Sequence, residues 1–151
     1  MGRILIIKDD GAIANKLLEK LSKKNRHSVK CAYSYASAVG LWNEAEKEGE
    51  KFNCIIIDLN ISPNGLEEDE IDNYFPIHGI LFLNKICKDK TPENIRGIWN
   101  STIVFSAYID RLKERKGEFD NFNLLELVSK QENVALSNLL NIVNEKLKNK
   151  K

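Results

Sequence analysis

The sequence predicts an α/β fold, in which a five-stranded parallel sheet carries helices on both of its faces. Three short runs are β-branched or apolar throughout, which is typical of strands that are buried on both faces. Segments with apolar residues at helical spacing lie between the strand candidates, so that strands and helices alternate along the chain. The three runs are residues 4–7, 55–57 and 102–105.

Weaker patterns complete this alternation. Two further strand candidates are residues 29–33 and 124–128. Helical spacing of apolar residues predicts helices around residues 13–21, 38–45, 80–87 and 136–147, and a short polar segment at 110–116 is a further helix candidate. Ser34 or Ser37 is available to cap the start of the second helix.

One segment, residues 60–78, interrupts the alternation. It contains two prolines and a cluster of acidic residues, namely Glu67, Glu68, Asp69, Glu70 and Asp72. Structureless segments of this length are uncommon in compact domains and are either functional or solvated surface excursions. We therefore predict a single domain, residues 1–151, with an extended loop at about 60–78 after the third strand.

Composition excludes several classes of protein. The chain has 151 residues, with 23 basic and 22 acidic side chains and a formal charge of +1. This balance argues against a dedicated nucleic-acid binder, and no apolar run approaches the roughly 18 residues of a membrane span. The three cysteines form no CxxC pair, which favours buried free thiols in a reducing compartment. We expect a cytoplasmic protein with no membrane partner and no direct contact with nucleic acid.

Polar and charged residues follow the predicted strands where each strand ends. Because ligands bind beyond the carboxyl ends of the strands in an open parallel sheet, we expect these side chains to converge at one edge. They are Asp9 and Asp10 after the first strand, Asp58 and Asn60 after the third, Ser106 after the fourth and Lys130 after the fifth.

The chemistry of this set points to phosphoryl transfer. Clustered carboxylates repel one another, and oxygen ligands without His or Cys favour Mg²⁺ or Mn²⁺ over zinc. A carboxylate beside such a metal can act as a nucleophile toward a phosphoryl group. The metal and a lysine would neutralise the charge on the phosphoryl oxygens, and a hydroxyl could hydrogen-bond one of them.

These strand ends resemble the receiver domain of two-component response regulators, in a divergent form, over about residues 3–148. The resemblance rests on the segments ILIIKDD at 4–10, CIIIDLN at 54–60, IVFSA at 103–107 and VSK at 128–130. It implies the flavodoxin-like (βα)5 receiver fold with no output domain in this chain. It also implies a phosphoacceptor with self-catalysed phosphorylation and dephosphorylation, not an enzyme acting on a separate substrate.

The resemblance assigns a role to each site residue. Asp58 would accept a phosphoryl group from a sensor histidine kinase or phosphotransfer domain, and Ser106 would be the switch hydroxyl. Lys130 would contact the phosphate. Asp10 would ligate Mg²⁺ directly, with Asp9 nearby. Asp58 and the Asn60 backbone carbonyl would be further ligands. The switched face would bind a downstream protein target or form a homodimer.

The sequence also departs from the family pattern. Gln131 follows Lys130 where the family usually has a proline, and Leu127 stands where it usually has an aromatic residue. With the long segment at 60–78, these departures favour an alternative: a degenerate receiver-like protein-interaction module that does not use phosphorylation. A hydrolase is a third class, but the sequence shows no substrate pocket for it.

Overall fold

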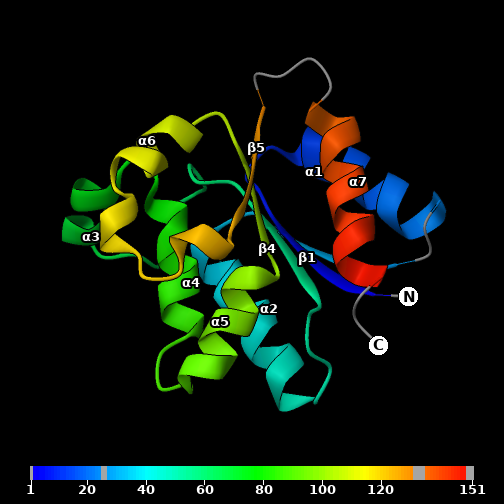
Figure 1. Ribbon diagram of the computed structural model, residues 1–151, viewed down its shortest axis with the longest axis horizontal. Coiled ribbons are helices and arrows are strands. Elements are labelled where there is room, and N and C mark those ends of the chain that lie inside the picture. The colour runs from blue at the N-terminus through cyan, green and yellow to red at the C-terminus, as the bar shows by residue number, and fades with distance from the viewer. Residues whose placement is uncertain (1, 25–26, 131–134, 149–151) are drawn as a thin grey trace.

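Five parallel strands form one sheet in the order β2-β1-β3-β4-β5, which confirms the predicted fold class (Figure 1). The computed structural model describes residues 2–24, 27–130 and 135–148. The strands are β1 (Arg3–Ile7), β2 (Ser28–Ala32), β3 (Cys54–Ile57), β4 (Thr102–Ser106) and β5 (Glu126–Ser129). In this order the chain reverses its direction of winding beside β1 and β3, where open α/β sheets bind their ligands.

Helices cover both faces of the sheet (Figure 1). The α-helices are α1 (Gly11–Glu19), α2 (Tyr35–Lys47), α3 (Glu68–Tyr74), α4 (Leu81–Ile86), α5 (Pro92–Asn100), α6 (Ile109–Glu114) and α7 (Ala135–Lys148). A π-helical segment, η1 (Lys20–Lys24), extends α1, and the 3₁₀ turn η2 (His78–Ile80) leads into α4. Two further 3₁₀ turns, η3 (Lys116–Glu118) and η4 (Phe122–Leu124), precede β5.

The strand alternation divides the core into two layers. On β1, Leu5 and Ile7 belong to the cluster that α2, α4 and α5 cover, whereas Ile4 and Ile6 belong to the cluster under α1 and α7. Successive side chains of a strand point to opposite faces, so a strand that is apolar throughout is buried on both. This explains why the runs without alternation lie in the middle of the sheet.

The N-terminal cap of α2 is one of the two serines predicted from the sequence, whereas the cap of α5 was not predicted. The Ser34 hydroxyl accepts a hydrogen bond from the Ser37 backbone N–H at 3.1 Å, so Ser34 is the cap of α2. The Thr91 hydroxyl caps α5, with Pro92 in the first turn. The sequence analysis did not predict α5, although a threonine followed by a proline is a common helix start.

The segment at 60–78 contains a helix, which corrects the expectation of an extended loop. Residues 68–74 form α3, whose first turn is acidic, and the Glu67 backbone N–H donates to the Glu70 carboxylate at 3.0 Å. Arg115 holds the other end of α3: its guanidinium donates to the Asn73 carbonyl oxygen at 2.7 Å and stacks over the Tyr74 ring at 4.5 Å. Residues 60–78, which we call the insertion, therefore contain a structured element that is attached to the end of α6.

The residue that follows the insertion, Gly79, packs against the backbone of the two residues that follow β3. A side chain at Gly79 would place its Cβ 2.5 Å from the Asp58 carbonyl oxygen and 2.7 Å from that of Leu59. The Gly79 backbone N–H donates to the Leu59 carbonyl oxygen at 2.7 Å. Only glycine permits this approach, so Gly79 is the point at which the insertion contacts the backbone of the candidate site.

Within residues 2–24, 27–130 and 135–148, no helix combines the length and the apolar character that crossing a membrane requires.

Candidate functional site

The register of the two central strands places Lys8 beside Asp58. Ile7 of β1 and Ile57 of β3 are paired, and the Asp58 backbone N–H donates to the Ile7 carbonyl oxygen at 2.9 Å. The residue after each strand therefore lies at the same level at the carboxyl edge of the sheet. One of these two residues is a lysine and the other is an aspartate.

The Asp58 carboxylate is buried and already paired. The residue is 5% exposed. Its Oδ2 accepts hydrogen bonds from the ammonium of Lys8 at 3.2 Å and from that of Lys130 at 2.7 Å. Its Oδ1 faces the backbone N–H of Asn60 at 3.4 Å, at the long end of hydrogen bonding. Both carboxylate oxygens thus have partners from the protein itself.

These contacts shift the pKa values at the site. Burial alone would raise the pKa of Asp58, but the Lys8 charge and hydrogen bonds from Lys130 and Ser106 outweigh it and hold that pKa below its usual value. Burial lowers the pKa of Lys8 to about 8, because the attraction of Asp58 only partly offsets desolvation of the ammonium. At neutral pH the site therefore contains an ionised carboxylate and two ammonium groups.

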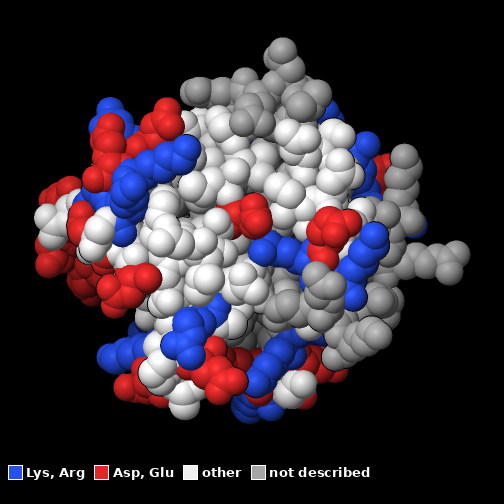
Figure 2. Space-filling model, viewed as in Figure 1, with Lys and Arg blue, Asp and Glu red and all other residues white. Residues whose placement is uncertain are grey.

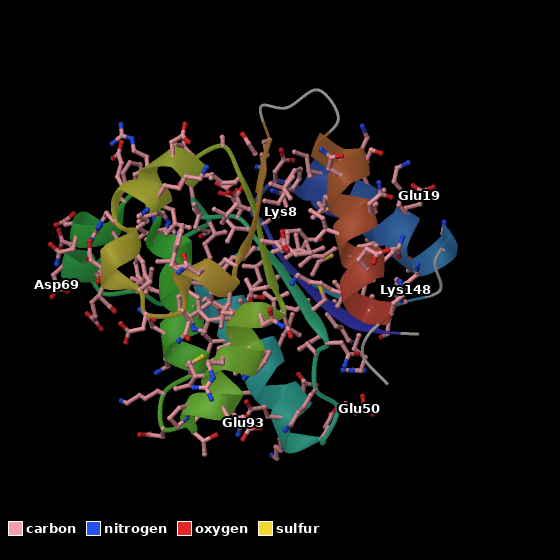
Figure 3. All side chains as sticks on the ribbon, in the orientation of Figure 1. Lys8, Glu19, Glu50, Asp69, Glu93 and Lys148 are labelled. Carbon is pink, nitrogen blue, oxygen red and sulfur yellow. The ribbon has the colours of Figure 1, made fainter. Side chains whose placement is uncertain are left out.

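Lys8 is the feature that the sequence analysis missed. Its side chain is completely buried, at 0% exposure, and in Figure 3 it lies in the interior of the molecule. The ammonium sits over the Phe105 ring, 4.9 Å from its centroid, and the Lys130 ammonium lies 6.0 Å from the same ring. A carboxylate and an aromatic face together stabilise the buried ammonium.

A signal for Lys8 was present in the sequence. The apolar runs of β1 and β3 both end in an isoleucine, and the next residues are Lys8 and Asp58. Aligning the two runs on their last apolar residue pairs the lysine, rather than Asp9 or Asp10, with Asp58. The acidic pair that follows Lys8 instead favoured Asp9 and Asp10 as the site residues after the first strand.

The structure brings Ser106 and Lys130 to Asp58. Ser106 is fully buried at the end of β4, where its hydroxyl accepts a hydrogen bond from the Tyr108 backbone N–H at 3.2 Å. The Lys130 backbone N–H donates to the Ser106 carbonyl oxygen at 3.2 Å, which carries the lysine toward the site from β5. The geometry of the Lys130–Gln131 peptide, where the family usually has a proline after the lysine, lies outside the described residues.

The two aspartates after β1 do not join Asp58 in a metal-binding cluster. Both are exposed, and the Asp10 carboxylate caps α1 by accepting the Ala12 and Ile13 backbone N–H groups at 3.0 and 3.3 Å. Among the described residues, no group of three or more His, Cys, Asp or Glu side chains is arranged to hold a metal ion. No such group of three carboxylates is found among the described residues, and the metal-binding role expected of Asp9 and Asp10 stays a prediction.

The donor set around Asp58 does not fit the predicted Mg²⁺ or Mn²⁺. Such ions take several oxygen ligands, whereas here a lysine ammonium occupies the side of Asp58 that faces β1. A divalent cation at this position would meet like charge from Lys8 and Lys130. The protein supplies its own counter-ions for the carboxylate.

Comparison with solved structures identifies the fold. The receiver domain of Francisella response regulator 1452 has a TM-score of 0.60 with 21% identity, covering 100% of both chains. The non-phosphorylated HemR receiver domain from Leptospira biflexa has a TM-score of 0.66 with 18% identity, covering 100% of this chain and 98% of that one. The chain has the fold of a response-regulator receiver domain. A CheY-like receiver domain protein from Methanospirillum hungatei JF-1 agrees, with a TM-score of 0.55, 18% identity and 98% coverage of both chains.

Comparisons at the level of sequence found no relative of this receiver-like chain. No model of a known protein family matches it, and no curated protein matches it. The similarity is thus one of fold, with substantial divergence in sequence.

Proposed function

We propose that this protein is a receiver-like protein-interaction module that works without phosphorylation of Asp58. The observation that supports this proposal is the buried ion pair between Lys8 and Asp58 at 3.2 Å. A phosphoacceptor carboxylate must present an oxygen to an incoming phosphorus atom, and the negative charge that gathers there must be neutralised. In this protein the neutralising charge is built in and is bound to the carboxylate itself.

The positive charges of Lys8 and Lys130 also oppose the binding of a metal ion beside Asp58. Displacing the Lys8 ammonium from Asp58 would leave a charged group fully buried without a carboxylate partner, which is costly in a folded protein. A divalent cation would have to bring about this displacement before it could bind beside Asp58. Lys8 and Lys130 thus keep Asp58 ionised and paired. The module would then bind its partner at all times, without a phosphorylation step.

A second candidate is the phosphoacceptor function that the resemblance implies. It is favoured by the position of Ser106 and Lys130, which both contribute hydrogen bonds at Asp58. In this case Asp58 would receive a phosphoryl group from a sensor histidine kinase or phosphotransfer domain, and the Mg²⁺ prediction would apply after Lys8 had moved. The two candidates differ in whether Lys8 leaves Asp58 when a phosphoryl donor is present.

A phosphorylation assay separates the two candidates. The protein is incubated with acetyl phosphate and Mg²⁺, and its intact mass is measured beside that of Asp58→Asn. We expect no labile phosphoryl adduct and no thermal shift with beryllofluoride. An adduct that forms in the wild type and is absent from Asp58→Asn would reject the interaction module without phosphorylation and establish the phosphoacceptor.

A variant at Lys8 tests the cause. Lys8→Asp removes the built-in cation and adds a carboxylate at the edge of the sheet, which creates an oxygen-rich site of the kind that Mg²⁺ prefers. We expect this variant, unlike the wild type, to gain a thermal shift with Mg²⁺. Lys85→Asp is the matched control, because it makes the same change of charge on an exposed residue of α4, and it should respond to Mg²⁺ as the wild type does. An equal response to Mg²⁺ in the wild type and in Lys8→Asp would show that Lys8 does not exclude the metal.

A further inference from the structure

A groove with a basic rim lies between α1, η1 and α7. It has a volume of about 510 Å³ and is lined by Lys16, Glu19, Lys20, Lys23 and Leu136. Lys16 and Lys23 are exposed, and neither forms an ion pair with any described residue. Leu136 is half-buried against the core and gives the groove an apolar side chain. We refer to these five residues as the basic groove.

A surface of complementary character lies on the insertion. Residues 67–75 include five acidic residues and no lysine or arginine. Glu68, Asp69 and Asp72 are exposed and form no ion pair with any described residue. At the end of α3, Phe75 is 64% exposed, and its ring stacks against that of His78 with 5.8 Å between centroids. We refer to these three acidic residues and Phe75 as the acidic surface.

The two surfaces lie on opposite sides of the molecule. Figure 3 labels Asp69 of α3 at one edge and Glu19 of the basic groove at the other. Figure 2 shows acidic side chains gathered over the α3 side of the molecule. A molecule therefore cannot place its own acidic surface in its own basic groove, and any contact between them must join two molecules.

We infer that the acidic surface of one molecule docks into the basic groove of a second copy. The lysines of the groove face the carboxylates of α3, and Phe75 supplies an apolar anchor for the Leu136 side of the groove. Because the basic groove and the acidic surface are different surfaces, the contact is head-to-tail. An assembly of any length then has a free basic groove at one end and a free acidic surface at the other. The inference does not depend on the chemistry of Asp58.

Charge governs this contact. Exposed ion pairs are individually weak and are screened by salt, so the association is weak and strongly dependent on ionic strength. Several pairs acting together also increase the rate at which the surfaces meet. The expected behaviour is reversible self-association at low salt that disappears at high salt, with no change in the fold of each molecule.

Sedimentation velocity of the full chain provides the first measurement. At about 20 mM NaCl the weight-average sedimentation coefficient should rise with protein concentration, and at about 500 mM NaCl it should stay at the monomer value. A monomer at low salt over the whole concentration range up to about 1 mM would overturn the inference. Self-association that is equally strong at both salt concentrations would also overturn it.

Charge-reversal variants locate the contact. One variant carries Lys16→Glu and Lys23→Glu in the basic groove, and the other carries Glu68→Lys and Asp72→Lys on α3. Each variant alone should associate at least about tenfold more weakly than the wild type, because like charges then face each other. An equimolar mixture should recover association, because each groove then meets an α3 of opposite charge.

A matched control keeps the result specific. Lys85→Glu with Lys88→Glu makes the same change in net charge on exposed residues at α4, away from both surfaces, and should associate as the wild type does. Circular dichroism confirms that each variant is folded, and the neutral pair Lys16→Gln and Lys23→Gln replaces a reversed variant that fails to fold. If the control weakens association as much as the groove variant, or if the mixture remains monomeric, the head-to-tail contact is rejected.

Discussion

The ammonium of Lys8 lies 3.2 Å from Oδ2 of Asp58, and the two side chains are 0% and 6% exposed. The ammonium of Lys130 binds the same oxygen at 2.7 Å, with its side chain 22% exposed. The carboxylate is thus paired with one lysine that has no access to water and one that does. This difference between the two lysines leads to the first two predictions.

Removing the buried lysine should not destabilise the protein at pH 7. Loss of one partner of a buried pair typically costs roughly 3–5 kcal/mol, but Lys130 still pairs with Asp58 and the lowered pKa of Lys8 shows that burying its charge is itself unfavourable, so we expect Lys8→Met to be at least as stable as the wild type. The double variant Lys8→Met with Asp58→Leu should lose less than the sum of the two single changes, with a coupling of at least about 1 kcal/mol. Urea unfolding measures all four corners of this cycle. Additive losses would show that the two groups do not interact.

The pKa of Lys8 predicts an unusual dependence of stability on pH. This pKa is about 8 in the folded protein, against 10.5 for an ordinary lysine, so between these values the unfolded chain binds more protons than the folded one. The free energy of unfolding should therefore rise with pH across this window, by about 2 kcal/mol between pH 8 and 10, relative to Lys8→Met. Below pH 8 the cost of burying the charge is fully present. Parallel stability curves for the two proteins from pH 7 to 10 would contradict this prediction.

Gly79 should tolerate no side chain. In Gly79→Ala the new Cβ would lie 2.5 Å from a backbone carbonyl oxygen of Asp58, so either the insertion or the end of β3 must move. We expect a loss of about 1–3 kcal/mol, measured by thermal or urea unfolding. Gly97→Ala is the matched control, because no atom lies within 4 Å of its added Cβ and the position is helical. That change should stabilise the protein by about 0.5–1 kcal/mol. Equal effects at the two positions would reject the close approach.

Arg115 should keep α3 in place without contributing much to global stability. Its guanidinium binds the Asn73 carbonyl oxygen at 2.7 Å and the Glu118 carboxylate at 2.6 and 2.8 Å, and it stacks over Tyr74. Arg115→Lys loses the planar fork and the stacking. We expect faster amide hydrogen exchange in residues 68–75, with a change of less than about 1 kcal/mol in unfolding free energy.

The exchange measurement for Arg115 has its own control on the same helix. Arg111 is an exposed residue of α6, and Arg111→Lys keeps the charge at a position that does not hold α3. Exchange in residues 68–75 should be unchanged in that variant. If Arg115→Lys leaves exchange in α3 as slow as in the wild type, the attachment of the insertion lies elsewhere.

Helices that lack a strong apolar stripe were the hardest to predict. Within α3 no residue is buried, and its sequence is acidic, so the pattern indicated a solvated loop. In α5 only Trp99 is buried, and the remaining signal was the cap at Thr91. By contrast, the buried strands β1, β3 and β4 were readily predicted, because almost every residue in them lies in the core.

Within the site, the sequence predicted which strand ends lie together, but it did not predict that Lys8 contributes a charged group there. Asp58, Ser106 and Lys130 lie together as expected. The role of Asp10 as the cap of α1 was not predicted, because it depends on where α1 begins, and helix boundaries are the least reliable feature of a sequence pattern. The roles that the resemblance gives these residues in phosphoryl transfer remain predictions.

By itself, the sequence determined the parallel sheet, its central strands and the edge at which charged residues collect, because these follow from local patterns of apolar residues. Only the tertiary structure decided which cation reaches Asp58. That outcome depends on the register between β1 and β3 and on the reach of a lysine side chain to the end of the neighbouring strand. Contacts between residues 50 positions apart are set by packing, and here packing placed an ammonium where the sequence had suggested a metal ion.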